Sequence, residues 1–291
     1  MSILPATLYV VATPLGNLAD LGARAREILA AVDFIAAEDT RRTRRLLESC
    51  AIRSRLTALH EHNEETRTPA LVARLARGES AALVSDAGTP LVSDPGYRLV
   101  RAAQDAGIAV RAVPGPCAAI AALSVAGLPS DRFAFEGFLP AKATARRGRL
   151  GALAKEPRTL IFYEAPHRLI ATLEDCVRAF GEAREAALAR ELTKVHESLH
   201  RRRLGELSQL VGSGAEPALG ECVLLVAGAR KDPGEETGGA PSADEVLEAL
   251  AAEGLGAKTA AAVAHRLTGK SRRDLYRRAI ELARRVKTSK R

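Results

Sequence analysis

The chain has 291 residues, of which 47% are apolar and 27% charged, and this balance excludes a disordered or fibrous protein. No stretch approaches the roughly 18 uninterrupted apolar residues of a membrane-spanning helix, and the N-terminus lacks signal-peptide character, so we expect a soluble cytoplasmic protein without a membrane partner. Residues 258–291 hold 12 Lys or Arg against 2 Asp or Glu, while the rest of the chain holds 31 against 33, so the net charge of +8 resides in the C-terminal tail.

The first part of the chain alternates short apolar runs with segments of helical period. Strands are expected at residues 8–12, 34–37, 81–85 and 109–113, and helices at about 20–31, 40–49, 64–77 and 96–106. Such alternation predicts βαβ units and a mostly parallel sheet. Ligands of these sheets bind at the loops beyond the carboxyl ends of the strands.

A second α/β region follows the break at residues 113–116 (VPGP). Strands are expected at 133–135, 159–163, 186–190 and 222–227, with a helix at about 167–180. The Arg- and Glu-rich segment 191–206 fits a strand or a hairpin, and periodicity does not decide between them. The predicted domains are therefore 1–115 and 116–228, both α/β with mostly parallel sheets.

The C-terminal region is predicted to be a small basic helical module. Residues 229–242 have linker composition, with Gly and Pro among charged residues. Three helical patterns lie near 243–252, 258–267 and 271–286, where Ser242 and Thr268 or Ser271 are candidate caps. The module spans residues 243–291.

The positive charge of this module indicates a polyanionic partner. The alternative is a solvated helix face that aids solubility. Further arginine clusters at 41–45, 146–149 and 201–203 favour the polyanion. With only 10 aromatic residues and no Trp, base stacking is not expected to supply the affinity, so phosphate contacts should do so and should weaken with salt.

Neither a metal site nor a disulfide is expected. The four cysteines are scattered without a C-x-x-C pair, and the six histidines show no metal-ligand spacing.

Three loops with Gly and Pro follow three of the expected strands: residues 12–17 (ATPLGN), 85–90 (SDAGTP) and 114–119 (PGPCAA). Glycine permits close backbone approach to a ligand and proline stiffens the loop. Together the loops would form a cleft suited to an adenine- and ribose-bearing ligand, although each loop alone reads as an ordinary turn. Neither a P-loop nor a G-x-G-x-x-G motif is present, which weakens ATPase and NAD-dehydrogenase interpretations.

Polar clusters also follow three strands, at residues 38–42 (EDTRR), 163–168 (YEAPHR) and 190–197 (RELTKVHE). Charges beside buried strands are costly unless they are paired, so a functional site is one interpretation. A network of structural salt bridges or helix caps is the other, since Asp39 and Thr40 could simply cap the next helix.

These loops and clusters, in this order, resemble the tetrapyrrole (corrin/porphyrin) methylase superfamily. Segments 135–140 (FEGFLP), 163–168 and 191–197 (ELTKVHE) bring the resemblance closest to a bacterial branch that methylates small-subunit rRNA. The resemblance covers residues 7–227 and implies two α/β domains, S-adenosylmethionine (AdoMet) in the cleft between them, and a homodimer. It further implies methylation of the ribose 2′-hydroxyl of a cytidine in 16S rRNA of the 30S subunit, with no DNA partner.

The resemblance also assigns the cofactor-binding residues. They are Pro14, Leu15, Ala87, Gly88, Thr89, Val92, Cys117, Ala118 and Glu164. Thr89 replaces the acidic residue of the tetrapyrrole enzymes, so a carboxylate contact to the cofactor is not assumed there. The first strand also ends without the Gly-rich loop common in corrin enzymes, and both departures fit the rRNA branch.

In-line methyl transfer from a sulfonium requires alignment of the reacting atoms, and a base for the hydroxyl proton would help. The catalytic candidates are Asp39, Glu164, Glu191, Lys194 and His196, and the sequence does not rank them. Two alternatives remain open: a methylase of the same fold acting on a tetrapyrrole or another small molecule, and a non-enzymatic RNA-binding factor with a degenerate cleft.

Overall fold

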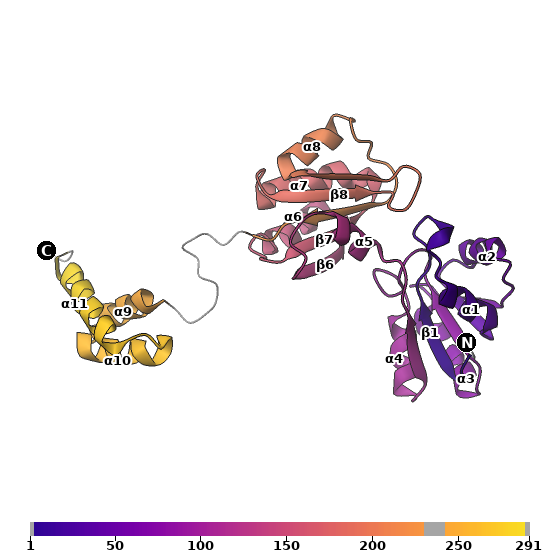
Figure 1. Cartoon of the computed structure of the whole chain (residues 1–291), viewed down its shortest axis with the longest axis horizontal. Coiled ribbons are helices and arrows are strands. Elements are labelled where there is room, and N and C mark those ends of the chain that lie inside the picture. The colour runs from indigo at the N-terminus through magenta and orange to yellow at the C-terminus, as the bar shows by residue number, and fades with distance from the viewer. Residues whose placement is uncertain (1–2, 230–241, 289–291) are drawn as a thin grey trace. The chain divides into compact units, whose positions relative to one another are not determined.

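The computed structural model describes residues 3–229 and 242–288, and the chain divides into two compact units, Met1–Ala229 and Arg230–Arg291 (Figure 1). Apart from its end residues, the expected linker 229–242 lies outside the described residues. The first unit contains two sheets and the second contains helices. No helix of the described residues is long and apolar enough to cross a bilayer.

The first sheet has the strand order β3-β2-β4-β1-β5, with every pair parallel. Its strands are β1 (Thr7–Val11), β2 (Phe34–Ala37), β3 (Leu56–Ala58), β4 (Ala81–Val84) and β5 (Ala109–Val113). Its helices are η1 (Leu18–Asp20), α1 (Ala23–Ala31), α2 (Thr40–Ser49), α3 (Glu64–Ala76) and α4 (Tyr97–Asp105). Strands β2 and β4 are buried along their whole length, because helices cover both faces of the sheet.

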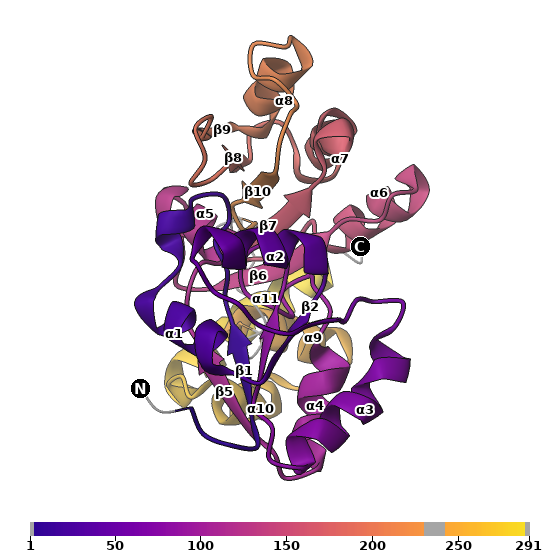
Figure 2. The same cartoon turned by 90° about the vertical axis from the view of Figure 1, so that its right-hand side faces the viewer.

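The chain segments that follow β1 and β4 diverge at the carboxyl ends of these neighbouring strands and leave a crevice there. Helices α1 and α2 pack on one face of the sheet through side chains such as Ile28 and Leu47. Helices α3 and α4 lie side by side on the other face, through Leu75 and Leu99 (Figure 2). The chain therefore leaves β1 toward one face and the neighbouring β4 toward the other, which is the switch point where α/β sheets bind ligands.

The second sheet has the order β6-β7-β10-β8-β9. Its strands are β6 (Phe133–Phe138), β7 (Thr159–Glu164), β8 (Glu185–Arg190), β9 (Ser198–Arg203) and β10 (Cys222–Val226). Its helices are α5 (Ala118–Val125), α6 (Ala143–Ala152), η2 (Pro166–Arg168), α7 (Leu169–Phe180) and α8 (Leu204–Gly212). Helices α6, α7 and α8 cover one face, whereas α5 covers the other.

The predicted fold class, two α/β regions followed by a helical module, is confirmed. One difference lies in the second sheet, where β6 and β7 pair in parallel but β10 runs antiparallel to β7 and β8. The undecided segment 191–206 forms β9, an antiparallel partner of β8, and is therefore part of a hairpin. Strand β3 was not expected, because it is short and only half-buried.

The second unit contains α9 (Ala243–Ala252), α10 (Ala257–Thr268) and α11 (Arg272–Thr288). Ser242 is the N-cap residue of α9, as expected. Its hydroxyl accepts a hydrogen bond from the Glu245 amide, and the Glu245 carboxylate accepts one from the Ser242 amide. Small and aliphatic side chains, among them Leu247, Ala261 and Leu275, form its core. The Arg278 guanidinium of α11 forms an ion pair with the Asp244 carboxylate of α9 at 2.7 Å.

Candidate functional site

The three Gly- and Pro-containing loops are joined to one another by hydrogen bonds. Thr13 and Gly88 exchange two backbone hydrogen bonds of 2.8 and 3.1 Å, which ties the loop after β1 to the loop after β4. The Thr89 hydroxyl donates to the carbonyl of Pro116 at 2.9 Å, which ties the second loop to the third. The loops therefore converge as a single wall at the carboxyl ends of β1, β4 and β5.

Gly88 occupies a backbone position that favours glycine. Its φ is +83°, and a Cβ added there would lie 3.2 Å from Cδ2 of Leu15. Both values indicate that this turn keeps its close approach to the neighbouring loop because it has no side chain. The wall of the cleft is consequently backbone at this point.

A cavity of about 420 Å³ lies between these loops and the ends of β7 and β10. This volume is within the range of small-molecule sites. From the first sheet its wall contains Leu15, Glu38, Arg42, Asp86, Ala87, Gly88, Thr89, Val92, Ser93 and Asp94. From the second sheet and its loops it contains Ala118, Phe138, Tyr163, Glu164, Ala165, Pro166, Gly220, Glu221, Cys222 and Val223.

Most residues predicted to bind the cofactor line this cavity. Those that do are Leu15, Ala87, Gly88, Thr89, Val92, Ala118 and Glu164. Pro14 and Cys117 are not among the lining residues. Cys117 instead occupies the N-cap position of α5 and packs against the core beneath that helix.

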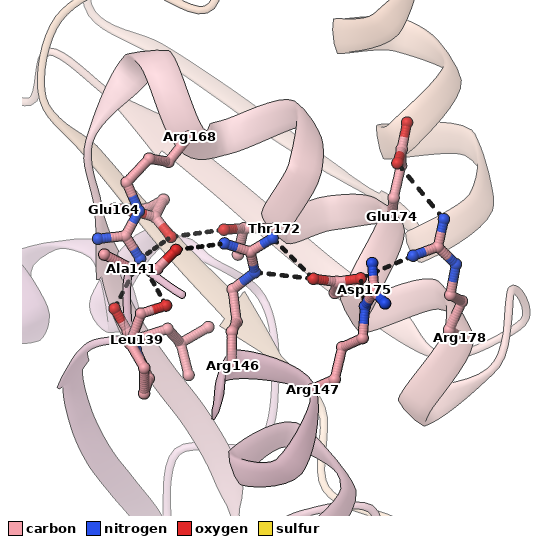
Figure 3. Close-up of polar contacts among 11 residues, drawn as sticks. Leu139, Ala141, Arg146, Arg147, Glu164, Arg168, Thr172, Glu174, Asp175 and Arg178 are labelled. Carbon is pink, nitrogen blue, oxygen red and sulfur yellow. Dashed lines mark hydrogen bonds and ion pairs between the residues drawn. The ribbon is translucent and has the colours of Figure 1, made fainter. Parts of the chain in front are cut away.

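Glu164 is a buried ion-pair residue, with its side chain 0% exposed. Arg168 contacts its carboxylate at 3.2 Å, the Thr172 hydroxyl donates to it at 2.6 Å, and the Ala165 amide donates at 2.8 Å (Figure 3). Arg168 also donates to the carbonyl of Leu139 at 2.6 Å. Since each Glu164 oxygen already accepts hydrogen bonds, this residue positions the wall of the cleft.

Asp39 caps α2 and is not among the lining residues of the cavity. Its carboxylate accepts from the Arg41 amide at 2.8 Å and pairs with the Arg41 guanidinium at 2.7 Å. The hydrogen bonds from the Arg41 side chain and amide hold the pKa of Asp39 far below its usual value. Of the two interpretations offered for this residue, the contacts support the helix cap.

Glu191, Lys194 and His196 lie on the segment between β8 and β9 and do not line the cavity. The Lys194 ammonium pairs with Glu191 at 2.9 Å and with Glu221, a lining residue, at 3.2 Å. A Cβ placed on Gly16 would overlap Cγ of Lys194, so this lysine packs on the loop after β1. The His196 side chain is exposed.

The sequence-based candidates omitted four carboxylates and two aromatic residues of the cavity wall. The omitted carboxylates are Glu38, Asp86, Asp94 and Glu221, and the aromatic residues are Phe138 and Tyr163. The Tyr163 hydroxyl accepts from the Ala119 amide at 3.1 Å, which connects β7 to the third loop. A signal for the acidic residues was present, because the Ser-Asp-Ala-Gly of residues 85–88 is repeated as Ser-Asp-Pro-Gly at 93–96.

Burial and like charges affect two of these carboxyls. Desolvation raises the pKa of Glu38. Desolvation, followed by the Glu38 charge, raises the pKa of Asp94 to about 6. Among the described residues, no group of three or more His, Cys, Asp or Glu side chains is arranged to hold a metal ion.

Comparisons with known proteins agree with this geometry. Residues 7–208 match the family of Tetrapyrrole (Corrin/Porphyrin) Methylases, and residues 237–283 match the RsmI C-terminal HTH domain. The chain is 54% identical over 275 residues to ribosomal RNA small subunit methyltransferase I of Pseudomonas aeruginosa, covering 94% of this chain and 97% of that relative. The protein of the same name from Escherichia coli O157:H7 is 53% identical over 274 residues, covering 94% of each.

A solved structure shares the fold of the first unit. Uroporphyrin-III C-methyl transferase from Thermus thermophilus, complexed with S-adenyl homocysteine, aligns with a TM-score of 0.53 at 18% identity. The alignment covers 76% of this chain and 97% of that structure. At this identity the comparison supports the fold alone.

Proposed function

This chain belongs to the family of tetrapyrrole (corrin/porphyrin) methylases, and from that premise we propose that it is an AdoMet-dependent rRNA methyltransferase. Its substrate is the ribose 2′-hydroxyl of a cytidine in 16S rRNA of the small ribosomal subunit. The relatives named ribosomal RNA small subunit methyltransferase I, about half identical over nearly the whole chain, support this substrate class.

The cavity fits AdoMet in size and charge. When bound, AdoMet supplies an electrophilic methyl group on a cationic sulfonium and carries a second positive charge on its amino group. The carboxylates of Glu38, Asp86 and Glu221 line the cavity and complement these charges. At Gly88 the wall carries no side chain, which lets a nucleoside approach the backbone closely.

The RNA is bound mainly through phosphates, and the basic helical module supplies much of this contact. The second unit matches an HTH domain, and residues 258–291 carry a net +10 from 12 basic and 2 acidic residues. The ribose 2′-hydroxyl distinguishes RNA from DNA, so DNA is not a substrate.

We also propose the domain bounds, the oligomeric state and the cellular location of the protein. The first unit comprises two domains, residues 1–115 and 116–228, each built on one of the two sheets. The protein acts as a homodimer, and the half-exposed Ile120 and Val125 of α5 are apolar side chains available for such a contact. It acts in the cytoplasm, where ribosomal subunits are assembled.

The observation that carries the proposal is the convergence of the three loops on one acidic cavity in a chain about half identical to named rRNA methyltransferases. Mass spectrometry of 16S rRNA from cells with and without this protein tests it, and a ribose-methylated cytidine should disappear on deletion. Labelled AdoMet and 30S subunits should restore the mark with purified protein. Label on a base, or on uroporphyrinogen in place of RNA, would contradict the proposal.

A further inference from the structure

Asp94 and Glu38 are the carboxylates of the cavity that form no ion pair among the described residues, and Glu38 accepts a hydrogen bond from the Asp86 amide at 3.4 Å. Asp86 pairs with Arg42 at 3.2 Å and accepts from the Asp39 amide, and Glu164 and Glu221 pair with Arg168 and Lys194. Within residues 3–229 and 242–282, no Lys or Arg forms an ion pair with Asp94. The Ser85 side chain lowers the pKa of Asp94, and its hydroxyl lies 3.4 and 3.5 Å from the carbonyl oxygens of Ala87 and Gly88.

The backbone around Asp94 is held in an unusual conformation. Leu91 and Ser93 have φ values of +72° and +66°, in the left-handed region that residues with a Cβ rarely adopt. Strain of this kind persists only where the surrounding structure fixes it, and it is common at functional sites. Here it shapes the turn after β4 that places Val92 and Asp94 in the cavity wall.

This turn meets the second sheet, so Asp94 lies where groups from both sheets converge. A Cβ added to Gly137 of β6 would lie 3.1 Å from the Ser93 hydroxyl oxygen. The charge of Asp94 also acts on the Tyr163 hydroxyl of β7, whose pKa is raised chiefly by burial. A substrate that reaches the cavity between the sheets therefore meets Asp94.

We propose that Asp94 is the general base of the methyl transfer, which makes it a catalytic residue in addition to the candidates suggested by sequence. This inference rests on the proposed function. The carboxylate accepts the proton of the ribose 2′-hydroxyl while a lone pair of that oxygen forms the new O–C bond. The electron pair of the broken C–S bond stays on sulfur, so the products are the methyl ether, S-adenosylhomocysteine and protonated Asp94, which then loses its proton to water.

The surroundings of Asp94 suit this role. Burial and the negative charges of Glu38 and Asp86 raise its pKa to about 6, against the opposing effect of the Ser85 side chain. The residue is thus ionised at neutral pH and yet more basic than an ordinary aspartate, as general-base catalysis requires. The charged and titratable groups that share its cavity are Glu38 after β2, Arg42 of α2, Asp86 after β4, Tyr163 and Glu164 of β7, Glu221 before β10 and Cys222 of β10.

The test is the Asp94→Asn substitution in the full chain, which keeps the shape of the side chain and removes its basicity. We expect the single-turnover rate of methyl transfer to 30S subunits from cells lacking this protein to fall about 100-fold or more. The AdoMet dissociation constant, measured by calorimetry, should change by less than about threefold, which separates chemistry from binding. Asp105→Asn, on an exposed residue at the end of α4, is the matched control and should keep the wild-type rate.

The pH profile provides a readout that a purely structural role would not alter. The wild-type rate should rise with pH up to about 6 and then level off, because it follows the ionised fraction of Asp94. Glu38→Gln removes a like charge, so it should lower the pKa of Asp94 and move this limb to lower pH. Asp94→Asn should abolish the limb.

Two results would overturn the inference while leaving the proposed function intact. One is an active Asp94→Asn enzyme with the wild-type profile, and the other is a wild-type rate that climbs steadily past pH 8. A wild-type protein that binds AdoMet but methylates no RNA would instead contradict the proposed function.

Discussion

Gly88 shapes the cavity wall through its backbone conformation. With φ at +83° and Cδ2 of Leu15 only 3.2 Å from an added Cβ, Gly88→Ala must distort the turn or move Leu15. A cost of about 1–2 kcal/mol is expected for a non-glycine residue in this region. We predict that AdoMet binding, measured by calorimetry, weakens about 10-fold, which corresponds to roughly 1.4 kcal/mol.

Gly22→Ala is the matched control for this substitution. Gly22 precedes α1 with φ at −58°, and nothing lies within 4 Å of an added Cβ. The Gly22→Ala variant should bind AdoMet with the same affinity as the unaltered chain. An unchanged affinity in Gly88→Ala would show that the turn does not support the ligand.

Residue types that line the cleft were predictable from the sequence, whereas the side chains with which they form ion pairs were not. Glu164 is the last residue of β7 and Asp94 lies in the turn after β4. Both line the cavity, but only Glu164 has an arginine against it. Glu164 has its partner because Arg168 lies four residues further along the chain. The position of Asp94 depends instead on the turn around Ser93. The sequence did not rank the candidate bases, and the contacts of Glu164 favour a positioning role for this residue.

At the scale of elements, α6 and α7 are joined by a buried ion pair that few sequence patterns would reveal. Asp175 of α7, 1% exposed, receives Arg146 of α6 at 2.8 Å and also contacts Arg147 and Arg178 (Figure 3). The arginines outweigh the effect of burial and hold the pKa of Asp175 below its usual value. Arg147 and Arg178 are more than half exposed, whereas Arg146 is buried.

We predict that Asp175→Ala destabilises the protein by about 3–5 kcal/mol, because Arg146 is left buried without its counterion. Urea unfolding followed by circular dichroism measures this change. Asp105→Ala, which loses an exposed contact with Arg101, should remain within about 0.5 kcal/mol. Replacing the pair with Arg146→Met and Asp175→Leu should recover much of the loss. A loss below about 1 kcal/mol in Asp175→Ala would contradict a structural role for this pair.

Strand positions were largely predictable, but strand direction in the second sheet was not. Residues 186–189 of β8 and the whole of β10 are continuous apolar runs buried on both faces, as parallel central strands also are. Their antiparallel pairing depends on the connections through β9 and α8, where the Arg-rich sequence has no clear period. Helices α5, α6 and α8 lacked clear signals, partly because α6 contains Gly148 and Gly151.

At the scale of the whole molecule, the two units are expected to contribute separately to binding. The cavity is lined by residues of the first unit alone, whereas the second carries most of the net charge. Deleting residues 241–291 should therefore weaken RNA binding and flatten its salt dependence while leaving AdoMet affinity nearly unchanged. Filter binding across a salt series, alongside calorimetry, measures both quantities.

Charge substitutions in the full chain control for the deletion. Arg272→Gln with Arg273→Gln, two exposed residues of α11, should reduce the slope of log affinity against log salt by about 1–2. Arg77→Gln with Arg101→Gln removes two exposed arginines from the first unit and should leave the slope unchanged. If RNA affinity survives the deletion, the tail serves as a solubilising surface.

The cavity wall extends from Leu15 to Val223 along the chain. A nascent polypeptide therefore cannot capture its methyl donor until β10 has left the ribosome, when nearly the entire first unit has been synthesised. Only the folded form binds the donor. The fraction of unfolded chains therefore falls as the concentration of AdoMet rises above its dissociation constant. Cells with ample AdoMet should consequently retain this protein longer against proteolysis than cells starved of methionine.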